Sequence, residues 1–301
     1  MSRRYILFNG LALSLLGVAL GGGGLAGCGD DFAPPSVVTG LRVLAVQADP
    51  LEVGPGEEVT VRPTLAVDPA DPVASLTWSF CPLTLGAATG HRCALPACDR
   101  DLGPGDAQGV VTAIPSALAQ ECLAQALASG EAGAGAPDGV PAELPAQVTT
   151  VFRLTAVSAG GDRRDAVLQL PLLLDGPPAE RNRPPEIAEV LVDGEPVPAS
   201  GVLPGAVAEG ERREVRVVVR AESLAQYVDD AGRERVEEAI VSFYASDGRF
   251  DDDRTAGRDT VNRWEASPLR PETEEVRFWI VVRDLRGGQA ASGPFVLEVA
   301  R

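Results

Sequence analysis

The sequence predicts an all-β protein built from two antiparallel β-sandwiches in series. Three observations support this fold class: short segments in which apolar and polar residues alternate, glycine-rich turns between them, and a second half that repeats the pattern of the first. Alternation with a period of two is typical of strands with one buried face. Several short strands with tight turns favour a sandwich over a parallel sheet with crossover helices.

The first half contains its clearest strand at residues 59–67. Val59, Val61 and Leu65 are apolar and alternate with polar or small residues. Pro63 lies inside this strand and indicates an edge or a bulge, because proline cannot donate a ladder hydrogen bond. Further strands are expected at 41–46, 75–80, 148–157 and 166–174, and Gly160-Gly161-Asp162 predicts a hairpin turn between the last two.

The second half predicts matching strands at 215–220, 239–245, 276–283 and 295–299. Phe278 corresponds to Phe152, and Gly287-Gly288 corresponds to Gly160-Gly161, so the offset is 126 to 127 residues (278 − 152 and 287 − 160). Gly-Glu pairs at 56–57 and 210–211 open the matching early strands. A repeat of this length indicates two copies of one domain rather than a solenoid.

Proline-rich segments divide the chain. They predict a tether at 28–40, a first domain at 41–175, a linker at 176–185 and a second domain at 186–301. Proline makes such segments semi-rigid spacers. The first domain is interrupted by an insertion at about 81–147, which holds four cysteines, an expected helix at 116–129 and a low-complexity stretch at 131–145.

Three short motifs stand in the second half: Asp247-Gly248-Arg249-Phe250, Asn262-Arg263-Trp264-Glu265 and the hairpin Asp284-Leu285-Arg286-Gly287-Gly288. With them, residues 184–301 resemble bacterial immunoglobulin-like domains of the polycystic-kidney-disease type, and residues 40–175 resemble them more loosely. The resemblance implies two tandem immunoglobulin-like β-sandwiches, with Trp78 at the place where such folds bury a tryptophan. It implies an architecture and names no ligand.

The composition excludes several function classes. The 301 residues include one His and 26 basic residues, all of them Arg, against 43 acids, for a net charge of -17. Without lysine there is no P-loop lysine and no Schiff base, and one His cannot build a multi-histidine metal site. An acidic chain is a poor nucleic-acid binder. We therefore expect no cofactor and no nucleic-acid partner.

The N-terminus has the layout of a secretory signal peptide over residues 1–27. Arg3 and Arg4 precede an apolar stretch that is shorter than a membrane span. The segment Leu25-Ala26-Gly27-Cys28 resembles the bacterial lipobox, which implies that Cys28 carries acyl chains and anchors the protein to a membrane. Gly29 in place of Asp favours the outer membrane of the cell envelope. Export by the general or the twin-arginine route stays open.

The other four cysteines are Cys81, Cys93, Cys98 and Cys122. An even number in an exported chain predicts two disulfides, and three pairings are possible. Short loops favour Cys81 with Cys93 and Cys98 with Cys122. The alternative is a zinc site that adds His91, but the cysteine spacing lacks the paired knuckles of such sites.

An acidic loop offers weak calcium candidates at Asp247, Asp251 and Asp253. Calcium needs six to eight converging oxygens, and the arginines interleaved here do not match an EF-hand loop. A solvated, partly salt-bridged loop is the alternative reading.

Two function hypotheses follow. The first is a non-enzymatic, lipid-anchored envelope protein that presents immunoglobulin-like domains for binding or assembly, with another envelope protein or a polysaccharide as partner. Its cysteine-bearing insertion is the expected recognition region, because loops on a rigid scaffold carry recognition. The second is a carbohydrate-active hydrolase or an accessory module of one, which would need converging carboxylates.

Overall fold

The computed structural model describes residues 35–54, 56–106, 109–113, 116–128, 147–174, 181–228, 232–266, 269–270 and 273–300. The expected signal peptide, Cys28, the low-complexity stretch and half of the expected linker lie outside these ranges. Within them, no helix is long and apolar enough to cross a membrane.

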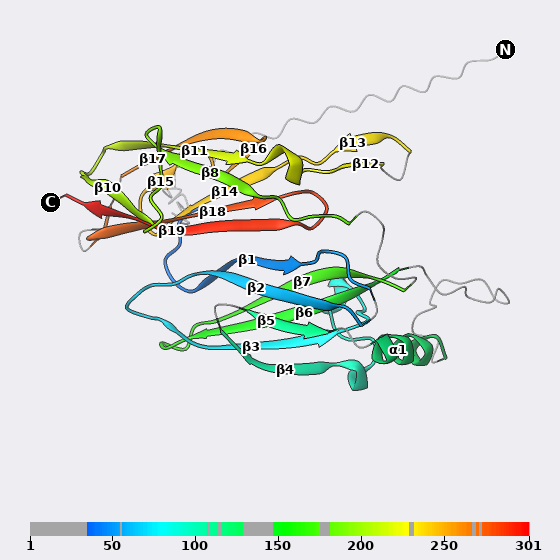
Figure 1. The fold of residues 1–301 in the computed structure, drawn as a ribbon. Coiled ribbons are helices and arrows are strands. Elements are labelled where there is room, and N and C mark those ends of the chain that lie inside the picture. Colours follow the sequence, from blue (N-terminus) through cyan, green and yellow to red (C-terminus); the bar gives the residue numbers. More distant parts are fainter. Residues whose placement is uncertain are drawn as a thin grey trace, which may run out of the picture. The chain divides into compact units, whose positions relative to one another are not determined.

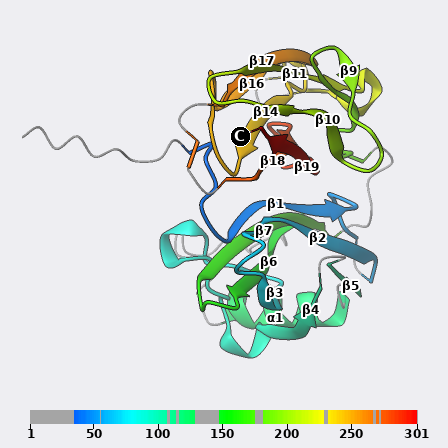
Figure 2. The same ribbon diagram turned by 90° about the vertical axis from the view of Figure 1, so that its left-hand side faces the viewer.

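The first sandwich has a sheet of three strands facing a sheet of four (Figures 1 and 2). The first sheet has the order β1-β2-β5, with β1 at Arg42–Asp49, β2 at Glu58–Ala66 and β5 at Val110–Ala113. The second has the order β4-β3-β6-β7, with β4 at Arg100–Gly105, β3 at Val73–Cys81, β6 at Gln147–Ser158 and β7 at Arg163–Leu173. All of these strands pair antiparallel.

The core of the first sandwich lies between these two sheets. Trp78 on β3 is 1 % exposed, as the tryptophan of a strand in this position should be, and Phe80 and Phe152 pack with ring centroids 5.0 Å apart. Helix α1 (Ser116–Ala128) matches the expected helix, and its Leu123 joins this core.

The second sandwich has two sheets of five strands. One has the order β15-β17-β11-β8-β9, with strands at Arg249–Phe250, Asp259–Glu265, Arg212–Val219, Ile187–Val192 and Glu195–Pro196. The other has the order β10-β19-β18-β14-β16, with strands at Val202–Val207, Gln289–Val299, Glu275–Arg283, Ile240–Ala245 and Arg254–Ala256. A separate hairpin pairs β12 (Gln226–Val228) with β13 (Glu234–Val236).

The predicted repeat is confirmed strand by strand. The order β7-β6-β3-β4 of the first sandwich returns as β19-β18-β14-β16, and β1-β2-β5 returns as β8-β11-β17. These orders are those of an immunoglobulin-like sandwich. Even the opening turns match, because Glu57 accepts a hydrogen bond from Gly54 N (2.9 Å) and Glu211 accepts one from Ala208 N (3.1 Å).

Two details differ from the expected antiparallel plan. Strand β10 runs parallel to β19, and the single bridge between Val53 and Leu172 is its parallel counterpart in the first sandwich. Pro63 lies in β2, which is the middle strand of its sheet. Since β5 pairs only as far as Val61, Pro63 lies where β2 has a free edge on that side.

The two sandwiches also share an apolar cluster, which we call the seam. It consists of Leu44, Ala45 and Ala66 from β1 and β2, Tyr244, Trp279 and Val281 from β14 and β18, and Val38. Trp279 is 2 % exposed and Val281 is fully buried. The seam therefore covers the outer faces of one sheet from each sandwich.

Segment Ser36–Val38, which we call the strap, precedes the first sandwich in sequence but pairs with the second. Val38 N donates to Ala245 O (2.8 Å), and Ala245 N donates to Ser36 O (2.9 Å), so the strap forms a parallel bridge with the end of β14. Strand β16 stops pairing at Ser242, and the strap continues that edge.

Strand directions define two ends. Strand β1 starts beside the strap and runs away from it. Strands β7 and β3 run the same way, because each is antiparallel to β6, so β3 ends at Cys81 on the far end. Strand β14 ends at the strap, which places its start at Ile240 and the β18–β19 turn on the far end as well. The disulfide-bearing region and the strap are thus at opposite ends.

Candidate functional site: the disulfide-linked insertion

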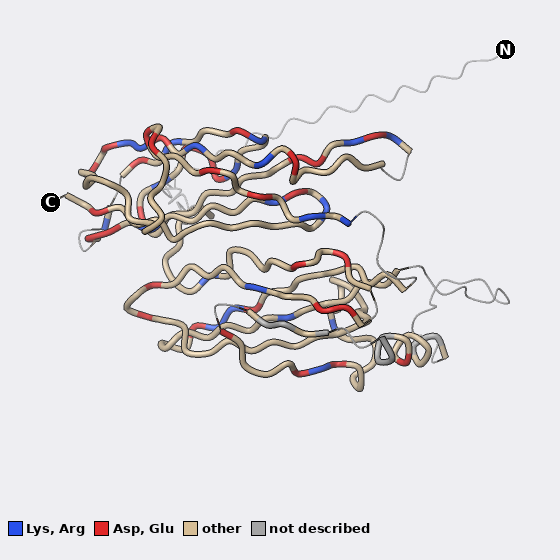
Figure 3. The backbone as a smooth tube through the Cα atoms, in the orientation of Figure 1, with Lys and Arg blue, Asp and Glu red and all other residues tan. Residues whose placement is uncertain are grey.

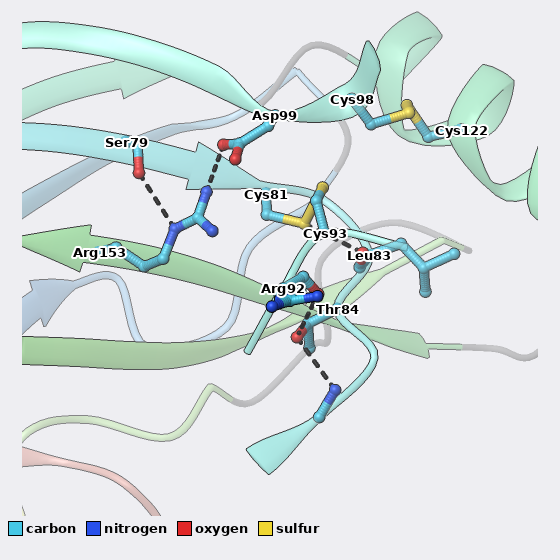
Figure 4. The surroundings of a disulfide bond; sticks show 11 residues. Ser79, Cys81, Leu83, Thr84, Arg92, Cys93, Cys98, Asp99, Cys122 and Arg153 are labelled. Carbon is cyan, nitrogen blue, oxygen red and sulfur yellow. Dashed lines mark hydrogen bonds and ion pairs between the residues drawn. A yellow bond between two sulfur atoms is a disulfide. The ribbon is translucent and has the colours of Figure 1, made fainter. Parts of the chain in front are cut away.

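The four cysteines of the insertion form the disulfides Cys81–Cys93 and Cys98–Cys122, the short-loop pairing (Figure 4). All four are buried and pack with Val151 of β6. The sulfur atoms bond to one another, so they are not thiolates that could bind zinc.

The first disulfide closes a loop at residues 82–92 directly after β3. Its base is a short antiparallel bridge, in which Ala94 N donates to Leu83 O (2.8 Å) and Leu85 N donates to Arg92 O (2.9 Å). The Thr84 hydroxyl donates to Arg92 O (3.1 Å) and accepts from Gly86 N (3.1 Å). These bonds give the disulfide loop a fixed base, and a one-turn 3-10 helix at Ala87–Thr89 forms its tip.

The disulfide loop presents three side chains of different chemistry. Leu85 is 45 % exposed and Arg92 is exposed. His91, half-buried, has a left-handed backbone (φ 56°), and Gln169 Nε2 of β7 lies 3.1 Å from its Nδ1. An apolar, a cationic and an imidazole group on one loop can contact a partner.

The second disulfide fastens α1 to the sandwich. Cys98 ends a 3-10 turn at Pro96–Cys98 just before β4, and Cys122 lies in the middle of α1. Strands β4 and β5 fall inside the range expected to be an insertion, yet they complete the two sheets. Among the residues of this range that the structure describes, the material added to the sandwich is therefore the disulfide loop, the 3-10 turn and α1.

Arg153 of β6 ties this region to the sheet below it. Its guanidinium forms an ion pair with Asp99 and donates from Nε to the Ser79 hydroxyl (3.1 Å) (Figure 4). The Arg153 side chain is 25 % exposed. Acidic and basic residues are interspersed along both sandwiches (Figure 3). The part of the chain that the structure describes holds no group of His, Cys, Asp or Glu suited to a metal.

The three calcium candidates predicted from the sequence have different surroundings. Asp247 follows β14 and is buried; its carboxylate accepts from Arg270 N (3.0 Å), Arg270 Nε (3.1 Å), Gly248 N and the Thr273 hydroxyl. Burial raises the pKa of Asp247, but the hydrogen bonds from Thr273, Arg270 and Gly248 outweigh it and hold that pKa below its usual value.

Asp251 and Asp253 are exposed and lie in the turn between β15 and β16. The side chain of Asn262 holds this turn, since its Nδ2 donates to Asp252 O (2.6 Å) and its Oδ1 accepts from Asp252 N. The Asp247 carboxylate is bonded to Arg270 and Thr273, whereas Asp251 and Asp253 are exposed, and calcium binding by these three residues stays a prediction.

A further buried charge at the far end was missed by sequence reasoning. The Glu237 side chain is 0 % exposed and accepts from Arg286 Nη1 (3.0 Å) and Ala225 N (2.8 Å). Burial raises the pKa of Glu237, and the nearby Asp284 carboxylate adds to this. Arg286 also lies 4.8 Å above the Tyr227 ring and 4.0 Å from Glu52 of the first sandwich. Glu237 stands in a polar, charged segment, so no pattern there marked it as buried.

Comparisons with known proteins assign no family to this chain. No protein-family model matches the chain, and no curated protein matches it. Solved structures similar to it include the D00-D0 domain of intimin, with 10 % identity and a TM-score of 0.23, which covers 85 % of this chain and 100 % of that one.

Two other similar structures are fibronectin(III)-like modules of Clostridium thermocellum CbhA and the FN1–FN3 domains of chicken CNTN1. The first has 12 % identity, a TM-score of 0.22 and coverage of 85 % of this chain and 93 % of that one. The second has 11 % identity, a TM-score of 0.22 and coverage of 88 % and 69 %. Likeness at this level carries no argument about what this chain binds, so the fold assignment rests on the sheets described above.

Proposed function

We propose that this chain is a non-enzymatic, lipid-anchored protein of the cell envelope whose far end binds another envelope component. The observation that carries the proposal is the separation of the two ends. The strap, eight residues after Cys28, lies at one end, and the disulfide-linked insertion lies at the other. A lipid on Cys28 would hold the strap end near the membrane and direct the insertion away from it.

The far end has the surface of a recognition site. Leu85 of the disulfide loop is exposed there, together with Val228, Val236 and Leu285 of the second sandwich, which are 62–68 % exposed. Loops held on a rigid scaffold often carry recognition, which supports the proposal. The Cys81–Cys93 disulfide fixes the loop beforehand, which lowers the conformational entropy lost on binding.

The anchor is tested by replacing Cys28 with Ala in the full chain. We expect the protein to leave the membrane fraction, because the acyl chains supply the attachment. Ser2→Ala is the matched control and should stay in the membrane fraction. Full membrane retention of Cys28→Ala would contradict the anchor.

The recognition end is tested by crosslinking in the envelope with the variant Leu85→Asp/Arg92→Glu. Both residues are exposed, so the variant should fold and lose a specific crosslinked partner. Val202→Asp, at a valine of β10 that is 49 % exposed, is the matched control and should keep that partner. An unchanged set of crosslinks in the double variant would place recognition on another surface.

A further inference from the structure

The second sandwich is incomplete without residues that precede the first. Strand β16 covers β14 only from Ile240 to Ser242, and the outward backbone groups of Ala245 are bonded to the strap. The strap therefore supplies the missing piece of a sheet edge, and it does so from more than 200 residues away in sequence (245 − 38 = 207).

The strap also brings a side chain into the seam. Val38 is 6 % exposed and packs with the cluster that buries Tyr244 and Trp279. Just after it, Arg42 places its guanidinium 5.2 Å from the Tyr244 ring. From the other side, Arg283 Nη2 donates to Leu44 O (2.6 Å).

A second set of contacts joins the sandwiches at the far end. Asn182 N donates to Glu52 Oε2 (3.0 Å), and Arg286 approaches the same carboxylate at 4.0 Å. Arg181 forms an ion pair with Glu57 (2.6 Å). The seam is thus held at both ends, by the strap at one and by the residues before β8 at the other.

Domains joined by a linker are expected to move relative to each other unless their interface is large and hydrophobic. We infer that the strap is a lock: by pairing with β14 and burying Val38, it holds the two sandwiches as one rigid body. Tension on the chain N-terminal to the strap then acts on the second sandwich as well as on the first. This inference concerns the folded chain alone and stands whether or not Cys28 carries a lipid.

Pulsed electron-spin resonance measures the lock directly. Spin labels at Val167→Cys in β7 and Val261→Cys in β17 report the distance between the sandwiches, since both valines are exposed (41 % and 48 %). The full chain carries Cys28→Ala so that only the introduced thiols react. We expect one narrow distance distribution in this parent, and a distribution at least twice as broad after Val38→Asp. Thr39→Asp is the matched control at an exposed neighbour and should stay narrow.

Two results would overturn the lock: a broad distribution in the parent, or a narrow one in Val38→Asp. Far-UV circular dichroism shows whether Val38→Asp keeps its strands. If it unfolds, Val38→Pro replaces it, because proline removes the N–H that donates to Ala245 but stays apolar. A narrow distribution in folded Val38→Pro would equally refute the inference.

Discussion

The two sandwiches hold the chain at equivalent positions of the fold by different chemistry. Phe80 of β3 pairs with Phe152, and Ala245 of β14 pairs with the equivalent Phe278. Cys81, which ends β3, is therefore the counterpart of Ser246, which follows β14. In the first sandwich this point is held by a disulfide. In the second it is held by the buried Asp247 carboxylate with Arg270 and Thr273, and Trp264 Nε1 donates to Asp247 O (3.0 Å).

The difference shows how the fold tolerates added material. After β3 the chain leaves the sandwich for the disulfide loop, whose few apolar side chains cannot hold it, so a covalent bond does. After β14 the chain stays against the sandwich, where a charged network can be shielded from water. One sandwich should therefore respond to reductant and the other to acid.

The largest effect expected is on reduction of both disulfides. Each bridge limits the unfolded chain and adds about 3 kcal/mol to the free energy of unfolding, so the first sandwich should lose about 6 kcal/mol. Urea unfolding of the full chain with and without reductant measures this. Tryptophan fluorescence of Trp78 in a Trp264→Phe/Trp279→Phe background assigns the loss to the first sandwich. An equal loss reported by Trp264 in a Trp78→Phe/Trp279→Phe background would contradict the comparison.

Next is Asp247→Ala, which leaves the Arg270 and Thr273 donors without their buried acceptor. The Arg270 side chain is 48 % exposed and can be hydrated, so we expect the free energy of unfolding to fall by about 2 kcal/mol. Because the pKa of Asp247 is lowered by folding, its contribution is present above the ordinary aspartate pKa, about 3.9, and is lost as pH falls through the folded value. In Asp247→Asn, the urea midpoint should fall less steeply than in wild type as the pH is lowered. An equally steep fall in both proteins would rule out this role of Asp247.

Glu237→Gln should change the pH dependence in the opposite direction. Burial raises the pKa of Glu237, so its contribution to stability is complete below the ordinary glutamate pKa and is lost as pH rises through the folded value. Relative to the Gln variant, wild type should therefore lose part of its free energy of unfolding over that rise. The measurement is the urea midpoint of both proteins across about pH 4 to 8. A difference between them that stays constant with pH would show that folding does not raise the pKa of Glu237.

The smallest effects belong to the matched opening turns. Glu57→Ala and Glu211→Ala each remove one hydrogen bond that a backbone N–H donates to a carboxylate, which is worth about 1 kcal/mol. Glu57 also pairs with Arg181, but both side chains are about 30 % exposed, so the pair adds little. Thermal unfolding should thus give nearly equal losses, and a loss confined to Glu57 would show that the turns are not equivalent.

Local patterns predicted most of each sandwich. Alternation predicted β2, β6, β11 and β18, because a strand with one buried and one solvent-exposed face alternates apolar and polar residues. The glycine pairs predicted both hairpin turns. Alternation failed on the second face of β18. Trp279 and Val281 lie between arginines at 277 and 283, and they are buried only because β1 packs on them.

The disulfides of the candidate site could be predicted from the sequence, but the contacts around Asp247 and the strap could not. Short loops favoured the observed disulfide pairing among the three that the sequence left open. The place of Asp247 did not follow from spacing, since its acceptor role depends on Arg270, 23 residues later in a segment without regular strand or helix. The strap was equally hidden, because a backbone bridge leaves no side-chain pattern.

The strap has a consequence for the order of folding. A chain is synthesised from its N-terminus, yet the strap binds Ala245, which is added 207 residues later (245 − 38). Contacts of such sequence separation form slowly. The first sandwich can close its core before the second is complete, whereas the seam and the strap can form only after most of the polypeptide has been made. Until then Leu44, Ala45 and Val38 lack the partners that bury them, so the incomplete chain exposes an apolar surface there.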